Sequence, residues 1–102
     1  MFDDSYAKQK FFEAVAALIG TASLQQRLRF ASFPLITLRA SAATNQHLSP
    51  DIELRFQKLM EKLTAKPLAL GDAYPPLEVT DDEAKELADE IFSIFVKVMG
   101  GL

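Results

Sequence analysis

A regular apolar stripe between Ser23 and Ala42 constrains the fold of this chain more than any other feature. Apolar residues recur there at steps of four, three, four and three, at Leu24, Leu28, Ala31, Leu35 and Leu38. This spacing is typical of one face of an α-helix. Three further residues are expected to widen that face, namely Phe30, Phe33 and Ile36. The sequence therefore predicts a buried central helix against which the rest of the chain packs.

Pro34 lies inside this stripe. It has no backbone N–H to donate, and its ring disfavours helical geometry at Phe33. We therefore expect either a kink near residues 31–33 or a break into two shorter helices. Truncation of Leu28 is expected to be costly, whereas truncation of Gln25 is expected to cost little.

A first helix is expected before the central one, from about Asp4 to Ile19, with Phe12, Val15 and Ile19 beside its buried stripe. Gly20 follows it and is expected to adopt a left-handed conformation, because it has no Cβ. Thr21 or Ser23 is then expected to cap the central helix.

Two more helices are expected after it. Ser49-Pro50-Asp51 indicates a helix start, and this helix is expected to end near residues 64–65. The Thr80–Glu83 sequence is typical of a capping box at the start of a last helix, which Gly100-Gly101 ends. With no alternating strand pattern, the 102 residues predict a single all-α domain, a four-helix and possibly five-helix antiparallel bundle.

Composition narrows the class of protein further. The chain has no cysteine, which excludes a disulfide framework and thiol catalysis. Its first residues lack the basic flank and apolar run of a signal peptide, and its longest apolar stretch is Ala14 to Ile19. A soluble cytoplasmic protein is expected.

Charge is distributed unevenly along the chain. Residues 23–66 carry a net charge of +4, whereas residues 67–102 carry −6. Lys85 is the one basic residue between residues 72 and 90, against eight acidic ones. The helix dipole accounts for the acids that open the last helix but not for the later ones, which repel one another.

This acidic segment has two interpretations. It is either a solvated helix face or a surface that attracts a basic partner, with an aromatic anchor such as Tyr74 or Phe2. On a helix, Asp82, Glu86 and Asp89 share one face, and Glu83, Glu86 and Glu90 share an adjoining one. The residues predicted to bind a partner are Asp72, Tyr74, Glu78, Asp82, Glu83, Glu86, Asp89 and Glu90.

No motif indicates catalysis, a cofactor or a metal site. His47 is the single histidine, and we expect it to be a surface loop residue. A DNA-binding role would use cations on two helices, Arg27, Arg29, Arg39, Arg55, Lys58 and Lys62. Arg27 and Arg29 point about 200° apart on a helix, however, so these cations are expected to pair with acids of the last helix or to be solvated.

Residues 11–20, 23–38 and 48–64 resemble a recurrent type of small bacterial protein. The residues that carry the resemblance are Leu24, Arg27, Leu28, Ala31, Leu38, Leu48, Ser49, Pro50, Phe56, Leu59, Leu63 and Thr64. They resemble immunity proteins that accompany contact-dependent growth inhibition toxins, and the general plan is similar to helical colicin immunity proteins. The resemblance implies a toxin inhibitor that covers the basic active site of a nuclease domain and performs no chemistry. A small DNA-associated regulator and a self-associating helical module remain alternatives.

Overall fold

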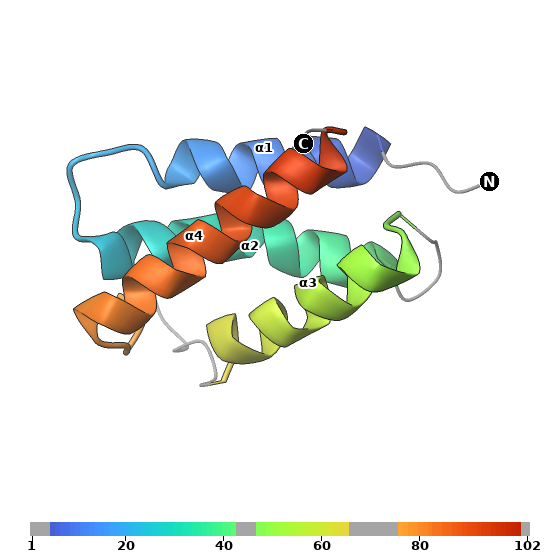
Figure 1. Ribbon diagram of the computed structural model, residues 1–102. Coiled ribbons are helices and arrows are strands. Elements are labelled where there is room, and N and C mark those ends of the chain that lie inside the picture. The colour runs from blue at the N-terminus through green and yellow to red at the C-terminus, as the bar shows by residue number, and fades with distance from the viewer. Residues whose placement is uncertain (1–4, 43–46, 66–75, 101–102) are drawn as a thin grey trace.

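The described residues fold into four α-helices that alternate in direction (Figure 1). The computed structural model describes residues 5–42, 47–65 and 76–100, and these ranges contain no β-strand. The helices are α1 (Ser5–Ala17), α2 (Leu24–Ala42), α3 (Pro50–Leu63) and α4 (Asp81–Val98). The predicted all-α, four-helix architecture is confirmed.

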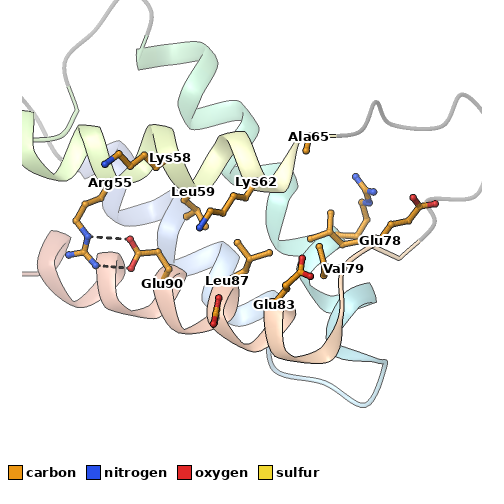
Figure 2. Close-up of a pocket in the computed structure, with 13 residues that line it drawn as sticks. Arg55, Lys58, Leu59, Lys62, Ala65, Glu78, Val79, Glu83, Leu87 and Glu90 are labelled. Atoms are coloured by element: carbon orange, nitrogen blue, oxygen red, sulfur yellow. Dashed lines mark hydrogen bonds and ion pairs between the residues drawn. The ribbon is translucent and has the colours of Figure 1, made fainter.

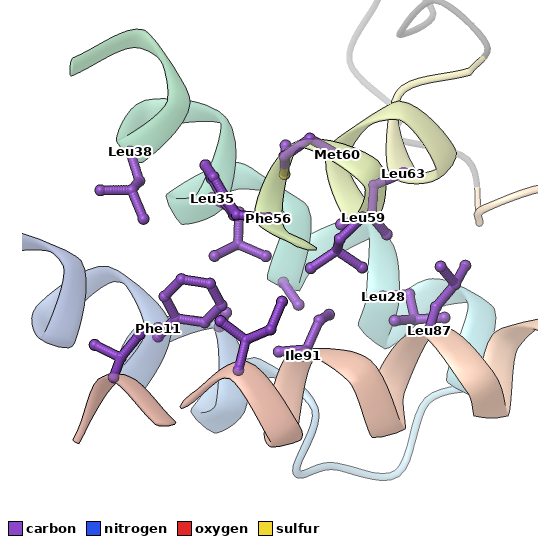
Figure 3. Packing of buried hydrophobic residues seen from close by; sticks show 14 of the residues in the cluster. Phe11, Leu28, Leu35, Leu38, Phe56, Leu59, Met60, Leu63, Leu87 and Ile91 are labelled. Atoms are coloured by element: carbon purple, nitrogen blue, oxygen red, sulfur yellow. The ribbon is translucent and has the colours of Figure 1, made fainter. Parts of the chain in front are cut away.

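The predicted central helix, α2, packs against each of the other three helices. Its apolar stripe is fully buried at Leu28, Ala31, Leu35 and Leu38. Leucines and aromatic residues from α1, α3 and α4 converge on it to form one core (Figure 3). The spacing of apolar residues along α2 therefore specified the centre of the bundle.

An aromatic pair of α1 and α3 lies in the core. Each of them packs against α2 and α4. The rings of Phe11 and Phe56 are fully buried, with their centroids 5.7 Å apart and their planes at 64°. This edge-to-face geometry is favourable for aromatic pairs and fixes the two helices across the core (Figure 3).

The widening of the apolar faces was predicted incorrectly at three positions. Phe30 is 45% exposed, and Phe12 and Ile19 are 63% and 79% exposed. Phe30 lies two residues from Leu28, which places it about 200° around the helix and away from the core. Residues adjacent to a buried stripe are buried only where a neighbouring helix covers them.

The helix α2 continues through Pro34, so the predicted break into two shorter helices is wrong for the described chain. A proline in a helix interior costs about 3 kcal/mol. Leu28 and Leu35, on either side of it, are fully buried, and burial of a leucine contributes about 1.5–3 kcal/mol. Packing on both sides outweighs the local cost, which favours four helices over five.

The end of α1 also differs from the prediction. Gly20 does not have a positive φ, so the left-handed conformation expected there is wrong. The Leu18 N–H is shared between the carbonyls of Ala14 and Val15, at 3.2 and 3.1 Å. The Leu18 carbonyl in turn accepts a hydrogen bond from Arg27 Nη1 at 2.7 Å. A side chain from α2, and not a glycine, satisfies this helix end.

The predicted start of α2, start of α3 and end of α4 are confirmed, but the Ser49 hydroxyl at the start of α3 does not cap a backbone N–H. Ser23 caps α2, since its Oγ accepts a hydrogen bond from Gln26 N at 3.1 Å. Ser49 precedes Pro50 at the start of α3, but its hydroxyl donates to Asp51 Oδ1 at 2.9 Å. At the other end of the chain, Gly100 adopts a φ of 80° after α4.

Candidate functional site

Of the eight predicted binding residues, five lie on α4 and Glu78 lies just before it. Asp72 and Tyr74 lie outside the described residues. Four of the others line a groove between α3 and α4, namely Glu78, Glu83, Glu86 and Glu90. Asp82 and Asp89 lie outside that groove and are exposed. The helical spacing predicts two adjoining faces that share Glu86, and the groove takes the face of Glu83, Glu86 and Glu90.

The start of α4 is fixed by a capping box and by α2. Thr80 Oγ1 accepts the Glu83 N–H at 3.1 Å, as predicted, while the Glu83 carboxylate accepts the Thr80 hydroxyl and not its backbone N–H. Gln25 Nε2 donates to Asp81 Oδ1 at 2.7 Å and to the Val79 carbonyl at 3.3 Å. These bonds set the position from which the acidic helix begins.

Gln25 also binds the preceding segment through its backbone. Its carbonyl accepts a hydrogen bond from Leu77 N at 3.1 Å, and Leu77 is buried. Gln25 therefore has a structural role, which does not fit the expectation that its truncation would cost little. No local sequence signal identifies it, because its partners are more than fifty residues away.

The groove between α3 and α4 has a volume of about 650 Å³ (Figure 2). We call it the α3–α4 groove. Its apolar surface comes from Leu59, Leu77 and Leu87, which are themselves almost fully buried, and from Val79. Its charged residues include four cations and four carboxylates: Arg29, Arg55, Lys58, Lys62, Glu78, Glu83, Glu86 and Glu90. A volume of this size is within the range of ligand-binding clefts.

One end of the α3–α4 groove is closed by an ion pair. Arg55 Nη2 lies 2.8 Å from Glu90 Oε1, and Arg55 Nε donates to Glu90 Oε2 at 3.2 Å. Arg55 Nη2 also donates to Ser93 Oγ at 3.0 Å. The Glu90 carboxylate raises the pKa of Arg55 above its usual value. This pair confirms, for Arg55, the predicted pairing of cations with the last helix.

Further along the groove, Lys62 and Glu83 extend into the space between α3 and α4 without contact, whereas Lys58 extends away from α4 (Figure 2). Lys58 and Lys62 extend from α3, and Glu83 extends from α4 (Figure 2). All three side chains are exposed. Within the described ranges, neither lysine forms an ion pair or hydrogen bond with a carboxylate. The groove therefore has a basic wall on α3 and an acidic wall on α4.

We call Asp82, Glu86 and Asp89 the outer acidic face, and Glu86 lies at the edge that this face shares with the α3–α4 groove. All three carboxylates are exposed. In the part of the chain that the structure describes, none of them forms a hydrogen bond or ion pair. Lys85 lies between Asp82 and Asp89 in sequence and is also exposed. Lys85 offsets one of the three negative charges, so this face carries a net charge of −2.

The arginines of α2 form contacts within the protein or are buried. Arg27 donates to the carbonyls of Leu18 and Ala22, at 2.7 and 2.9 Å. Arg39 Nη1 donates to Thr64 Oγ1 at 3.2 Å, which joins α2 to the end of α3. Arg29 is buried, with 4% of its surface exposed. They do not form the exposed basic row that a DNA-binding surface would require.

His47 is less isolated than predicted. Its Nε2 lies 2.7 Å from Ser41 Oγ, and its ring lies 5.2 Å from that of Tyr6. The Lys10 ammonium in turn lies 5.4 Å from the centre of the Tyr6 ring. These contacts join α1, the end of α2 and the segment before α3, so His47 is partly buried and has a packing role.

We compared the chain with known proteins. Searches with protein-family models, curated proteins and solved structures found no match to this chain. Across residues 5–42, 47–65 and 76–100, no cluster of three acidic or histidine side chains is suited to hold a metal ion. No helix in these ranges is long and apolar enough to cross a membrane.

Proposed function

We propose that this protein is a cytoplasmic immunity-type inhibitor that binds a basic toxin domain, a nuclease, through the outer acidic face of α4. The observation that carries the proposal is the group of exposed carboxylates at Asp82, Glu86 and Asp89, which form no ion pair with any described residue and of which Lys85 offsets only one charge. Nuclease active sites bind phosphates and are therefore basic. An acidic face of this kind is complementary to such a site.

The helix dipole favours Asp82 in the first turn of α4, but it does not account for Glu86 and Asp89. Like charges three or four residues apart on a helix destabilise it by about 0.2–0.5 kcal/mol per pair. Glu86 lies four residues after Asp82 and three before Asp89. A basic partner converts this repulsion into attraction and increases the rate of association.

The bundle holds the outer acidic face in a fixed position. The opposite side of α4 is buried at Ala84, Leu87 and Ile91. Gln25 and Thr80 fix the start of the helix by hydrogen bonds. A preorganised face loses little conformational freedom on binding, which supports tight inhibition.

The direct test uses the product of the adjacent gene. Its C-terminal domain, expressed alone, is expected to stop bacterial growth, and co-expression of this protein is expected to restore growth. Purified together, the two proteins are expected to form a stable complex without nuclease activity. If the adjacent product is not toxic, or if growth is not restored, the immunity function is contradicted.

Charge variants test whether protection depends on the outer acidic face. The D82K/E86K/D89K variant is expected to lose protection, and K85E is expected to keep it. All four side chains are exposed and away from the core, so both variants are expected to remain helical. Circular dichroism provides the control.

Self-association is a second candidate function, favoured by exposed apolar side chains on several helices. Phe12 on α1 is 63% exposed, and Phe92 on α4 is 55% exposed. Large exposed aromatic side chains occur at protein interfaces. Sedimentation velocity at several concentrations tests self-association: a sedimentation coefficient that rises with concentration would support it, and a constant one would contradict it.

A further inference from the structure

The outward side of α4 changes from acidic to apolar along the helix. Side chains that are seven residues apart on an α-helix point within about 20° of each other, so they form a column. One column contains Asp82, Asp89 and Val96, and the column beside it contains Lys85, Phe92 and Met99. The outer acidic face therefore continues, on the same side of α4, into an apolar surface.

This apolar surface is accessible. Phe92 and Met99 are each more than half exposed, and Val96 is partly exposed. The Met99 N–H donates to the Phe95 carbonyl at 2.9 Å, so the helical path extends to Met99. Single exposed apolar side chains are ordinary on a protein surface, but three in adjoining columns form a patch. We call Phe92, Val96 and Met99 the apolar patch of α4.

The ring of Phe92 is supported by the core. Its centroid lies 6.3 Å from that of Phe95, with the two ring planes at 45°. Phe95 is partly buried and packs against the hydrophobic core. A ring held in this way loses little conformational freedom when a partner covers it. Phenylalanine is also among the aromatic residues enriched at the centres of protein interfaces.

We propose that the apolar patch of α4 and the outer acidic face form one interface, and that the partner has an apolar pocket for Phe92 beside its basic site. This inference rests on the inhibitor function proposed above. Phe92 lies about 4.5 Å along the helix axis from Asp89 and about 9 Å from Glu86, at 1.5 Å per residue. A basic surface that pairs with these carboxylates is therefore close enough to cover Phe92 as well.

The charges of this face favour a basic partner over a second copy of the chain. In a parallel pair of α4 helices, the carboxylates of one copy would lie against those of the other. In a fully overlapping antiparallel pair, the acidic half of one copy would lie against the apolar patch of the other. Burying a carboxylate against apolar side chains is costly unless a cation accompanies it. Only a partner that is basic in one part and apolar in the next complements both halves.

The two halves of the face are expected to act on different steps of binding. Exposed charges attract a partner before contact, so they change mainly the association rate constant. An apolar side chain that fills a pocket acts only after contact, so it changes mainly the dissociation rate constant. The two contributions can therefore be measured separately.

The test measures both rate constants with the toxin domain identified through co-expression. F92A is expected to raise the dissociation rate constant about thirtyfold, the effect of truncating a dominant interface residue. The association rate constant is expected to change by less than about twofold. The matched control is F12A, since Phe12 is also an exposed phenylalanine but lies on α1, and it is expected to change neither constant. Circular dichroism confirms that both variants are folded.

An unchanged dissociation rate constant in F92A would overturn the inference. The inhibitor function would still stand if D82K/E86K/D89K slowed association, so the two failures are distinguishable. Equal increases in F92A and F12A would also overturn the inference, because the effect would not be specific to α4. Self-association that F92A abolishes, measured by sedimentation, would assign the patch to a second copy and contradict a pocket on the toxin. Failure of the two proteins to form a complex would contradict both proposals.

Discussion

Arg55 and Glu90 connect α3 to α4 through two parallel hydrogen bonds, with Nη2–Oε1 at 2.8 Å and Nε–Oε2 at 3.2 Å. Each side chain is more than one-third exposed, so solvent screens the pair. Even so, bidentate geometry makes the pair stronger than a contact through a single hydrogen bond.

We expect E90Q to lower the free energy of unfolding by about 0.5–1 kcal/mol, the upper range for an exposed ion pair. Urea unfolding measures this loss. The matched control is D89N, because Asp89 is exposed and has no partner among the described side chains. An equal loss in both variants would show that the Arg55 contact contributes nothing specific.

The core assignment predicts opposite results for two neighbours on α2. Leu28 is fully buried, so L28A is expected to lower the free energy of unfolding by about 2–5 kcal/mol. Phe30 is 45% exposed, so F30A is expected to change it by less than about 1 kcal/mol. Thermal or urea unfolding measures both. A costly F30A would mean that this residue is covered in the native protein.

Gln25 is expected to stabilise the start of α4. Q25A removes the bonds to Val79 and Asp81, and we expect a loss of about 0.5–1.5 kcal/mol. Hydrogen exchange of the Glu83 and Ala84 amides is expected to accelerate, because the first turn of α4 frays. Q26A on the same turn is the control, and accelerated exchange there as well would contradict a specific role for Gln25.

Ser49 is expected to control the titration of Asp51. The hydrogen bond from its hydroxyl lowers the pKa of Asp51 below the ordinary 3.8. Since the folded pKa is below the unfolded one, this stabilisation is present above the unfolded pKa and is lost as pH falls through the folded one. S49A is expected to raise the Asp51 pKa toward its ordinary value in an NMR titration. An unchanged titration would exclude this cause.

Local sequence signals predicted much of the fold. The apolar stripe of α2, the Ser49-Pro50 start of α3 and the Thr80–Glu83 cap all appear in the structure. These features depend on residues within one or two helical turns of one another. Helical periodicity and capping chemistry are local, so they can be recognised before the tertiary structure is known.

The candidate site was less accessible to prediction because it depends on pairs of distant residues. The Glu90 carboxylate was assigned to a partner surface, but it binds Arg55, thirty-five residues earlier in the chain. Gln25 likewise reaches Asp81 across fifty-six residues. Such partners follow from helix packing, which the apolar pattern constrains only loosely. For this reason the outer acidic face retains Asp82, Glu86 and Asp89 and excludes Glu90.

The outer acidic face is tested most directly by the association rate constant with the toxin domain identified through co-expression. We expect the rate constant to fall at least tenfold in D82K/E86K/D89K, to rise in K85E, and to decrease steeply with salt in the unmodified protein. Stopped-flow fluorescence at several salt concentrations gives all three values. A rate constant that is the same in the charge-reversed and unmodified proteins, at low salt, would contradict recognition by these carboxylates.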